Sequence, residues 1–256
     1  MTVKQKVSGI YLLPNLLTTS SLFAAFYSIV ASFKGFYDVA AIAIFIGMIA
    51  DSLDGRIARM TNTQTAFGAE YDSLSDLVTF GVAPAMLTYS WDLERLGKLG
   101  WLVSFIYTAA VALRLARFNT QLETADKRYF QGLACPTGGA ILASLVWVCE
   151  SYEILASKMS LIVVIVSLVT SILMVSNIRY YSFKDLDVRG KNRFLHVLII
   201  VLLFVAVALN PQLVLLVASL GYALSGPVQT LVAVHRMRKH RRQLAKGRKM
   251  KKTDRP

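Results

Sequence analysis

Apolar runs close to the length of a membrane-spanning helix repeat along the whole chain. A helix needs about 20 predominantly apolar residues to cross the hydrocarbon core of a bilayer. Eight segments approach that length, and polar or charged residues separate them. They predict an all-α integral membrane protein with about eight transmembrane helices, at residues 12–33, 36–57, 70–91, 99–118, 137–148, 159–178, 194–209 and 212–234.

Two consecutive apolar segments carry acidic residues, one at its C-terminal end and the next at its N-terminal end. Asp51 and Asp54 lie in the last turns of the second predicted helix, and Asp72 and Asp76 lie in the first turns of the third. Spacings of three and four residues place each pair on one face of its helix. Acidic residues inside a membrane are rare and usually functional. The two pairs are therefore the first candidates for a site.

Side-by-side packing of these two helices would bring the four carboxylates together. Their uncompensated negative charge at the edge of a bilayer requires a cation between them. Oxygen ligands select hard divalent ions such as Mg²⁺, Mn²⁺ or Ca²⁺ over zinc. The spacing of the acids therefore predicts a divalent metal site.

The composition agrees with a membrane protein. The 256 residues are 55% hydrophobic, and their mean hydropathy is +0.52. A net charge of +13 is also typical of nucleic-acid binding, but the basic residues lie in short loops and in a tail. Anionic lipid headgroups explain them better than nucleic acid. We expect a polytopic membrane domain at residues 1–235 and a basic cytoplasmic tail at 236–256. Cys135 and Cys149 match no disulfide or metal pattern and are interpreted as packing residues.

The distribution of basic residues predicts the orientation in the membrane. With the N-terminus in the cytoplasm and eight spans, 24 of the 28 Lys and Arg residues lie in cytoplasmic segments. The opposite orientation would violate the positive-inside rule. Both termini and the acidic cluster are therefore expected on the cytoplasmic side of the cell's inner membrane.

Eight residues between positions 51 and 76 stand at fixed spacings that carry a family resemblance. They are Asp51, Asp54, Gly55, Ala58, Arg59, Gly68, Asp72 and Asp76. This set resembles the signature of the CDP-alcohol phosphotransferases, which are integral membrane enzymes of phospholipid synthesis. The resemblance implies a helical bundle with a cytoplasm-facing active site and two divalent ions, Mg²⁺ or Mn²⁺. It implies Asp51, Asp54 and Asp72 as metal ligands, and Asp76 as the base with a metal contact of its own.

The resemblance also implies a donor and a set of residues that bind it. The donor is CDP-diacylglycerol, embedded among membrane lipids, and CMP is the leaving product. Small side chains at two positions let a nucleotide approach the helix backbone, although close helix packing explains them about as well. An arginine offers a forked donor to phosphate oxygens. The implied donor-binding residues are Asn15, Asp54, Gly55, Ala58, Arg59 and Thr65.

Three further stretches resemble the phosphatidylserine synthase branch of the family. They are LPNLLT at 13–18, RLARFN at 114–119 and FQGLACP at 130–136, where Ala134 replaces a proline of the branch pattern. The branch implies L-serine as acceptor. Arg114 or Arg117 could take the serine carboxylate, and Asn119 could orient the amine. Anchoring of a helix end at anionic headgroups is the alternative role of these arginines.

Two other functions stay open from the sequence. Glycerol-3-phosphate would also suit two arginines, so a phosphatidylglycerophosphate synthase is an alternative within the family. A divalent-cation transporter is the alternative from another class. The chain argues against transport because all four acids lie on adjacent segments and the second half has no matching cluster. The resemblance also makes a homodimer an expectation.

Overall fold

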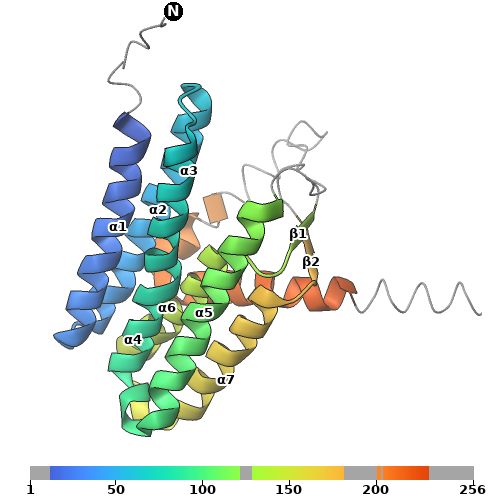
Figure 1. Ribbon diagram of the computed structural model, residues 1–256. Helices are drawn as coiled ribbons and strands as arrows, with labels where there is room; N and C mark the ends of the chain where they lie inside the picture. Colours follow the sequence, from blue (N-terminus) through green and yellow to red (C-terminus); the bar gives the residue numbers. More distant parts are fainter. Residues whose placement is uncertain (1–11, 122–128, 182–200, 203, 231–256) are drawn as a thin grey trace, which may run out of the picture.

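The computed structural model describes residues 12–121, 129–181, 201–202 and 204–230, and these are almost entirely helical (Figure 1). Residues 204–209 are also helical. The elements in chain order are α1 (Leu12–Phe33), α2 (Tyr37–Met60), α3 (Ala66–Asp76), the π-helical segment η2 (Leu77–Val82), α4 (Ala83–Trp91), the short 3₁₀ helix η3 (Leu93–Leu96), α5 (Lys98–Gln121), β1 (Tyr129–Gln131), α6 (Cys135–Ser151), α7 (Ala156–Val175), β2 (Arg179–Tyr181) and a last helix at Pro211–Thr230.

Five of the six helices expected before residue 180 are present with ends within three residues of the expected ones, and the third departs in two ways. The helix expected at 70–91 begins four residues earlier, at Ala66, because the Thr65 hydroxyl caps it by accepting a hydrogen bond from the Gly68 backbone N–H at 3.0 Å. It is then interrupted by the π-helical segment η2 before α4 completes it. Parts of the helices expected at 194–209 and 212–234 lie outside the described residues.

One small sheet departs from the all-α expectation. β1 and β2 pair antiparallel, with Phe130 opposite Tyr180. Two backbone bonds extend the link beyond the strands, from the Gly132 N–H to the Ile178 carbonyl and from the Leu133 N–H to the Leu173 carbonyl. The segment before α6 is thereby fixed to the end of α7.

Four helices of the described residues are long and apolar enough to cross a membrane: 13–33, 98–120, 156–175 and 211–230. Helices of this length and composition are typical of membrane proteins. The other helical segments are less typical spans for visible reasons. Two acids and the arginines of the motif lie inside α2, η2 divides α3 from α4, and α6 has only 17 residues. The number of eight spans remains a prediction.

Small side chains bring α1 and α2 close together in one buried cluster. Ala25, Ala40 and Ile44 are fully buried there and pack with Leu87 of α4 and Val146 of α6. A second buried cluster, around Phe80 and Tyr107, joins η2 to α5, α6 and α7.

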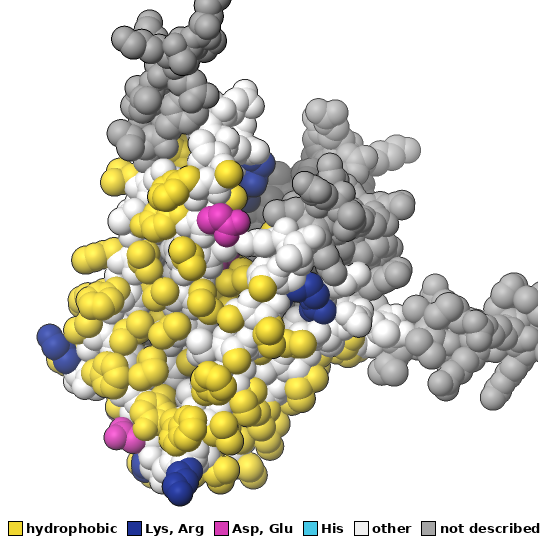
Figure 2. Space-filling model, viewed as in Figure 1, with side chains coloured by type: hydrophobic (Ala, Val, Ile, Leu, Met, Phe, Trp, Pro, Cys, Tyr) yellow, Lys and Arg dark blue, Asp and Glu magenta, His cyan; other side chains and the backbone are white. Residues whose placement is uncertain are grey.

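The outer faces of the helices are strongly apolar. Phe23 on α1 is 70% exposed and Ile49 on α2 is 62% exposed. Apolar exposure continues beside the acidic motif, at Leu53, Phe67 and Leu74. Figure 2 shows hydrophobic side chains spread over the visible face of the bundle. Such a surface is what a helix bundle presents to lipid.

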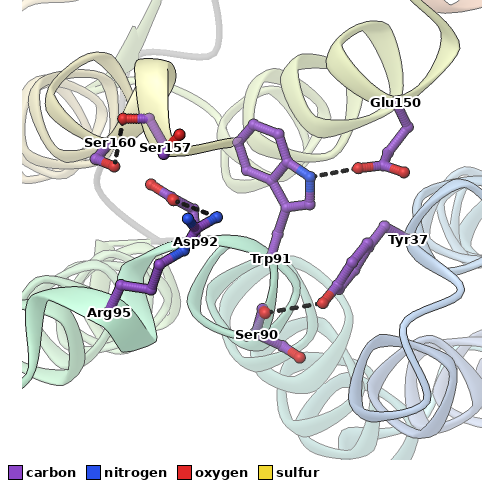
Figure 3. A network of polar contacts seen from close by, with 8 residues as sticks. All are labelled: Tyr37, Ser90, Trp91, Asp92, Arg95, Glu150, Ser157 and Ser160. Atoms are coloured by element: carbon purple, nitrogen blue, oxygen red, sulfur yellow. Dashed lines mark hydrogen bonds and ion pairs between the residues drawn. The ribbon is translucent and has the colours of Figure 1, made fainter. Parts of the chain in front are cut away.

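A polar cluster closes the end of the bundle at which α2 begins (Figure 3). The Tyr37 hydroxyl donates to the Ser90 carbonyl at 3.0 Å, and the Trp91 indole N–H donates to Glu150 Oε1 at 2.5 Å. Asp92, which is buried, forms an ion pair with the exposed Arg95 at 3.2 Å. Tyr37 and Asp51 are separated by about 21 Å along α2, so this cluster is remote from the acidic motif.

Candidate functional site

Three of the four aspartates converge where α2 meets α3. Single carboxylate oxygens of Asp51, Asp72 and Asp76 all lie within 4.8 Å of one another, and all three side chains are half-buried. The last turns of α2 contribute Asp51. The i, i+4 spacing on α3 places Asp72 and Asp76 on the face directed toward it. The convergence expected from the spacing is confirmed for these three acids.

The cluster has the chemistry of a divalent cation site. Asp72 Oδ1 and Asp76 Oδ1 are buried and have no hydrogen-bond partner among the described residues. Buried polar atoms are normally hydrogen-bonded, and three carboxylates that repel one another need a positive charge between them. A divalent ion would satisfy both requirements, because carboxylate oxygens are the ligands that Mg²⁺ and Mn²⁺ prefer. The residues present therefore fit such an ion.

Asp54 lies beside the cluster and has a partner of its own. It is buried and accepts a hydrogen bond from the Thr18 hydroxyl of α1 at 2.6 Å. It is close enough to Asp51 and Asp72 to repel both carboxylates. Thr18 also accepts, through its backbone carbonyl, a bond from the Ser75 hydroxyl at 3.2 Å. Thr18 therefore links α1 to both acid-bearing helices.

The guanidinium of Arg59 lies over Gly55, one turn earlier on α2. A Cβ at Gly55 would stand 3.4 Å from Arg59 Nη1, so the guanidinium lies directly beside this glycine. Arg59 is exposed and also attracts Asp54 electrostatically. Ala58 is half-buried. The exposed guanidinium of Arg59 therefore lies beside the small residues Gly55 and Ala58 and close to the carboxylates.

Asn15 and Thr65 meet at the start of α3. A Cβ at Gly68 would stand 3.1 Å from Thr65 Oγ1 and 3.5 Å from Asn15 Oδ1. The fold thus brings the polar residue near the start of α1 to the N-terminus of the helix that bears Asp72 and Asp76. Helix N-termini favour negative groups, because their N–H groups and dipole point outward.

Arg114 is a buried arginine with part of its donor capacity unused. Only 9% of the residue is exposed, and its Nη1 donates to Cys135 Sγ at 3.3 Å. Its Nε has no partner among the described residues. Cys135 is also within electrostatic reach of Asp76, so Arg114 and the acidic cluster belong to the same region. Cys135 and Cys149 are both buried and free, as expected of packing residues.

Arg117 and Asn119, the other two residues predicted to bind an acceptor, are engaged with neighbouring helices. Arg117 donates to the Met174 and Ser176 carbonyls at 3.1 and 3.3 Å, and to Asn177 Oδ1 at 3.1 Å. It thereby satisfies the free carbonyls at the C-terminus of α7. Asn119 Nδ2 donates to the Ser73 hydroxyl at 3.0 Å, which joins the end of α5 to α3.

This arrangement predicts that Arg117→Ala lowers stability. The substitution removes three hydrogen bonds from a charged donor, which together contribute about 2–4 kcal/mol to the free energy of unfolding. The measurement is the melting temperature of purified protein in detergent. Lys98→Ala, an exposed change at the other end of α5, is the control and should leave the melting temperature within about a degree. Equal melting temperatures for both variants would contradict the capping role of Arg117.

Comparisons with known proteins place these features in a family. A family model described as CDP-alcohol phosphatidyltransferase matches residues 11–173. A CDP-diacylglycerol--serine O-phosphatidyltransferase of Helicobacter pylori strain J99 is 36% identical over 199 residues, which are 78% of this chain and 84% of the relative. One of the same description from Mycobacterium leprae is 29% identical over 91% of this chain and 78% of the relative. An archaetidylserine synthase of Methanothermobacter thermautotrophicus is 33% identical over 69% of this chain and 72% of the relative.

Proposed function

The chain belongs to the CDP-alcohol phosphatidyltransferase family, and we propose that it transfers the phosphatidyl group of CDP-diacylglycerol to the hydroxyl of L-serine. The products are phosphatidylserine and CMP. The descriptions of the relatives support serine as the acceptor. The observation that carries the chemistry is the convergence of Asp51, Asp72 and Asp76, with two buried carboxylate oxygens that have no partner among the described residues.

Asp76 is the proposed base. In the reaction, the serine hydroxyl oxygen forms a bond to the lipid-side phosphorus while the bond from that phosphorus to the CMP oxygen breaks. The hydroxyl proton has to leave as the new bond forms, and a carboxylate within hydrogen-bond reach can accept it. Asp76 Oδ1 is suited to this because no described residue donates to it.

The remaining carboxylates hold the metal in this proposal. Asp51, Asp54 and Asp72 are the proposed principal ligands of two ions, Mg²⁺ or Mn²⁺, and Asp76 adds a contact; Asp51, Asp72 and Asp76 are the three whose oxygens converge. When bound, the ions neutralise the pyrophosphate and the charge that develops on the leaving oxygen. The bond from Thr18 to Asp54 orients that carboxylate from α1.

The donor is held by residues of α2, of the start of α3 and of the first turn of α1. Arg59 gives a forked donor to phosphate oxygens, and Gly55 and Ala58 leave space beside the backbone for the nucleotide. Asn15 and Thr65, which meet at Gly68, supply polar contacts at the start of α3. The acyl chains stay among the membrane lipids along the exposed apolar faces of the helices.

Arg114 is the residue that we assign to the serine carboxylate. Its Nε has no partner among the described residues, and it lies in the region of Asp76. Arg117 and Asn119 also came from the sequence as serine-binding residues, but their donors already bond to α7 and α3. We therefore propose that these two position the end of α5, which carries Arg114.

The proposal includes a cellular setting. The protein crosses the inner membrane about eight times, with both termini and the acidic cluster in the cytoplasm, where serine and CDP-lipids are available. Residues 1–235 form the catalytic domain, and the basic tail at 236–256 lies against anionic lipid headgroups. A homodimer is part of the same proposal.

An acceptor screen tests the function. Purified protein in detergent is given CDP-diacylglycerol and Mg²⁺ or Mn²⁺, and CMP release is followed with serine, glycerol-3-phosphate, inositol or choline supplied singly. We expect the most release with serine, and at least about 100-fold less with inositol or choline, because neither of these carries an anionic group that Arg114 would bind. Preferential release with glycerol-3-phosphate would keep the mechanism and overturn the serine assignment. Folded protein that is silent with all four would overturn the enzyme.

A further inference from the structure

The helix that carries Asp72 and Asp76 changes its winding directly after Asp76. The next six residues, Leu77–Val82, form the π-helical segment η2, and the Ala83 N–H bonds to the Val78 carbonyl five residues earlier. π-Helical turns are rare and are frequently found at functional sites. A π-turn inserts one residue into an α-helix, so it rotates the two flanking parts by about 100° relative to an uninterrupted helix.

That rotation decides where the two aspartates point. α4, on one side of η2, is anchored in the core through Ala83 and Leu87, which are fully buried. α3, on the other side, has to present Asp72 and Asp76 to Asp51 of α2. Without the inserted residue, the same packing of α4 would turn the two acids of α3 away from Asp51 by about 100°.

A buried tyrosine bonds to this segment. The Tyr107 hydroxyl of α5 donates to the Phe80 carbonyl at 2.9 Å, and Tyr107 is fully buried. The change of hydrogen-bond register in a π-turn leaves a backbone carbonyl without a regular helical donor. A side-chain donor to that carbonyl therefore stabilises the segment. The hydroxyl is therefore a specific support for the irregular winding.

Close contacts from other helices surround the same segment. A Cβ at Gly47 of α2 would stand 3.0 Å from the Thr79 methyl, and a Cβ at Gly139 of α6 would stand 3.4 Å from Phe80 Cα. Thr79 also shares a hydrogen bond with Ser21 of α1 at 3.2 Å. η2 is thus held between α1, α2, α5 and α6.

We propose that η2 directs the aspartate face of α3 toward Asp51, and that Tyr107 is a positioning residue for the metal centre because it stabilises η2. The inference deepens the proposed function and rests on it for its catalytic meaning. It assigns no contact of Tyr107 with a substrate or an ion. Loss of the Tyr107 hydroxyl would change how Asp51, Asp72 and Asp76 are arranged, and would therefore lower their affinity for a cation.

The test is a comparison of Tyr107→Phe with Tyr37→Phe. Both changes remove one tyrosine hydroxyl that donates to a backbone carbonyl, at 2.9 and 3.0 Å. Tyr37 bonds to the carbonyl of Ser90 near the end of α4 (Figure 3). Ser90 lies 14 residues after Asp76, so this bond is remote from the aspartates. Mn²⁺ binding to the full-length protein in detergent is measured by the electron paramagnetic resonance signal of free Mn²⁺. We expect about 3- to 10-fold weaker binding for Tyr107→Phe and wild-type binding for Tyr37→Phe.

A second variant reaches the same segment from another helix. Gly47→Ala places a Cβ 3.0 Å from the Thr79 methyl of η2 and 3.4 Å from the Ser21 carbonyl oxygen of α1. It presses on η2 from α2, and we expect it also to weaken Mn²⁺ binding. This variant decides the question if Tyr107→Phe does not fold. Folded Tyr107→Phe or Gly47→Ala with wild-type Mn²⁺ binding would overturn the inference. If the variants bind Mn²⁺ more weakly and the wild-type protein transfers nothing to serine, the inference is supported and the proposed function is overturned. The two failures are therefore distinguishable.

Discussion

Asp76→Asn should reduce CMP release by a factor of about 10²–10⁴ while the protein still binds CDP-diacylglycerol. The amide has nearly the same shape as the carboxylate but cannot accept the proton of the attacking hydroxyl, and a general base contributes a factor of this size. The substitution also removes one of the three clustered carboxylates, next to an oxygen of Asp72 that has no partner among the described residues. The measurements are kcat with serine and thermal stabilisation by CMP, which reports nucleotide binding without turnover.

Two further measurements distinguish a role of Asp76 as the base from a role as a metal ligand. Glu70→Gln removes an exposed carboxylate from the same helix and should keep kcat within about twofold. Raising the Mn²⁺ concentration should restore little activity to Asp76→Asn if the lost group is the base. Full recovery at high Mn²⁺ would show that Asp76 acts only as a ligand, and undiminished kcat at ordinary Mn²⁺ would remove it from the mechanism.

Arg114→Ala should raise the KM for serine by about 10- to 100-fold. A charge-assisted pair with a carboxylate in a buried site contributes about 1.5–3 kcal/mol, which corresponds to this factor. The KM for CDP-diacylglycerol should stay near its wild-type value, because the proposed donor contacts come from α1, from α2 and from the start of α3, and none from α5. Steady-state kinetics with each substrate varied in turn gives both constants.

Arg117→Ala is the matched comparison, because it removes the same side chain one helical turn away on α5. Its donors are taken by the end of α7, so the KM for serine should be unchanged even though the protein melts earlier. Arg114→Lys, which keeps the charge without the fork, should lie between wild type and Arg114→Ala. An equal rise of both KM values in Arg114→Ala, or no rise in either, would contradict a role in binding the carboxylate.

The sequence was most informative where periodicity and composition act locally. The apolar run at 12–33 has the same bounds as α1, and helical spacing of the acids predicted their convergence. The earlier start of α3 was also within reach, since Thr65 is a good N-cap residue and its hydroxyl bonds to the backbone three residues later.

The π-helical turn could not be predicted in this way. Leu77–Val82 has an ordinary apolar composition, and the changed hydrogen-bond register depends on contacts from elsewhere in the chain. Those contacts are the Tyr107 hydroxyl and the close approaches at Gly47 and Gly139. Because they come from three other helices, no local pattern around Asp76 carries the information.

The two arginines of α5 show a similar limit. Arg114 and Arg117 have the same chemistry and lie three residues apart, so the sequence offered both for the serine carboxylate. The fold separates them: Arg114 is buried beside Cys135, whereas Arg117 lies against the last carbonyls of α7. The length of α7 and its position beside α5 decide this difference, and both are properties of the packed bundle.

The exposed apolar side chains beside the aspartates have a kinetic consequence. Leu53, Phe67 and Leu74 continue the lipid-facing surface up to the turns that carry the acids. A two-chain donor can therefore meet the site by lateral diffusion, and its lipid product can leave the same way, without either being extracted into water. For such an enzyme the effective donor concentration is its mole fraction in the bilayer, so inert lipid dilutes the substrate even when the amount per litre is constant.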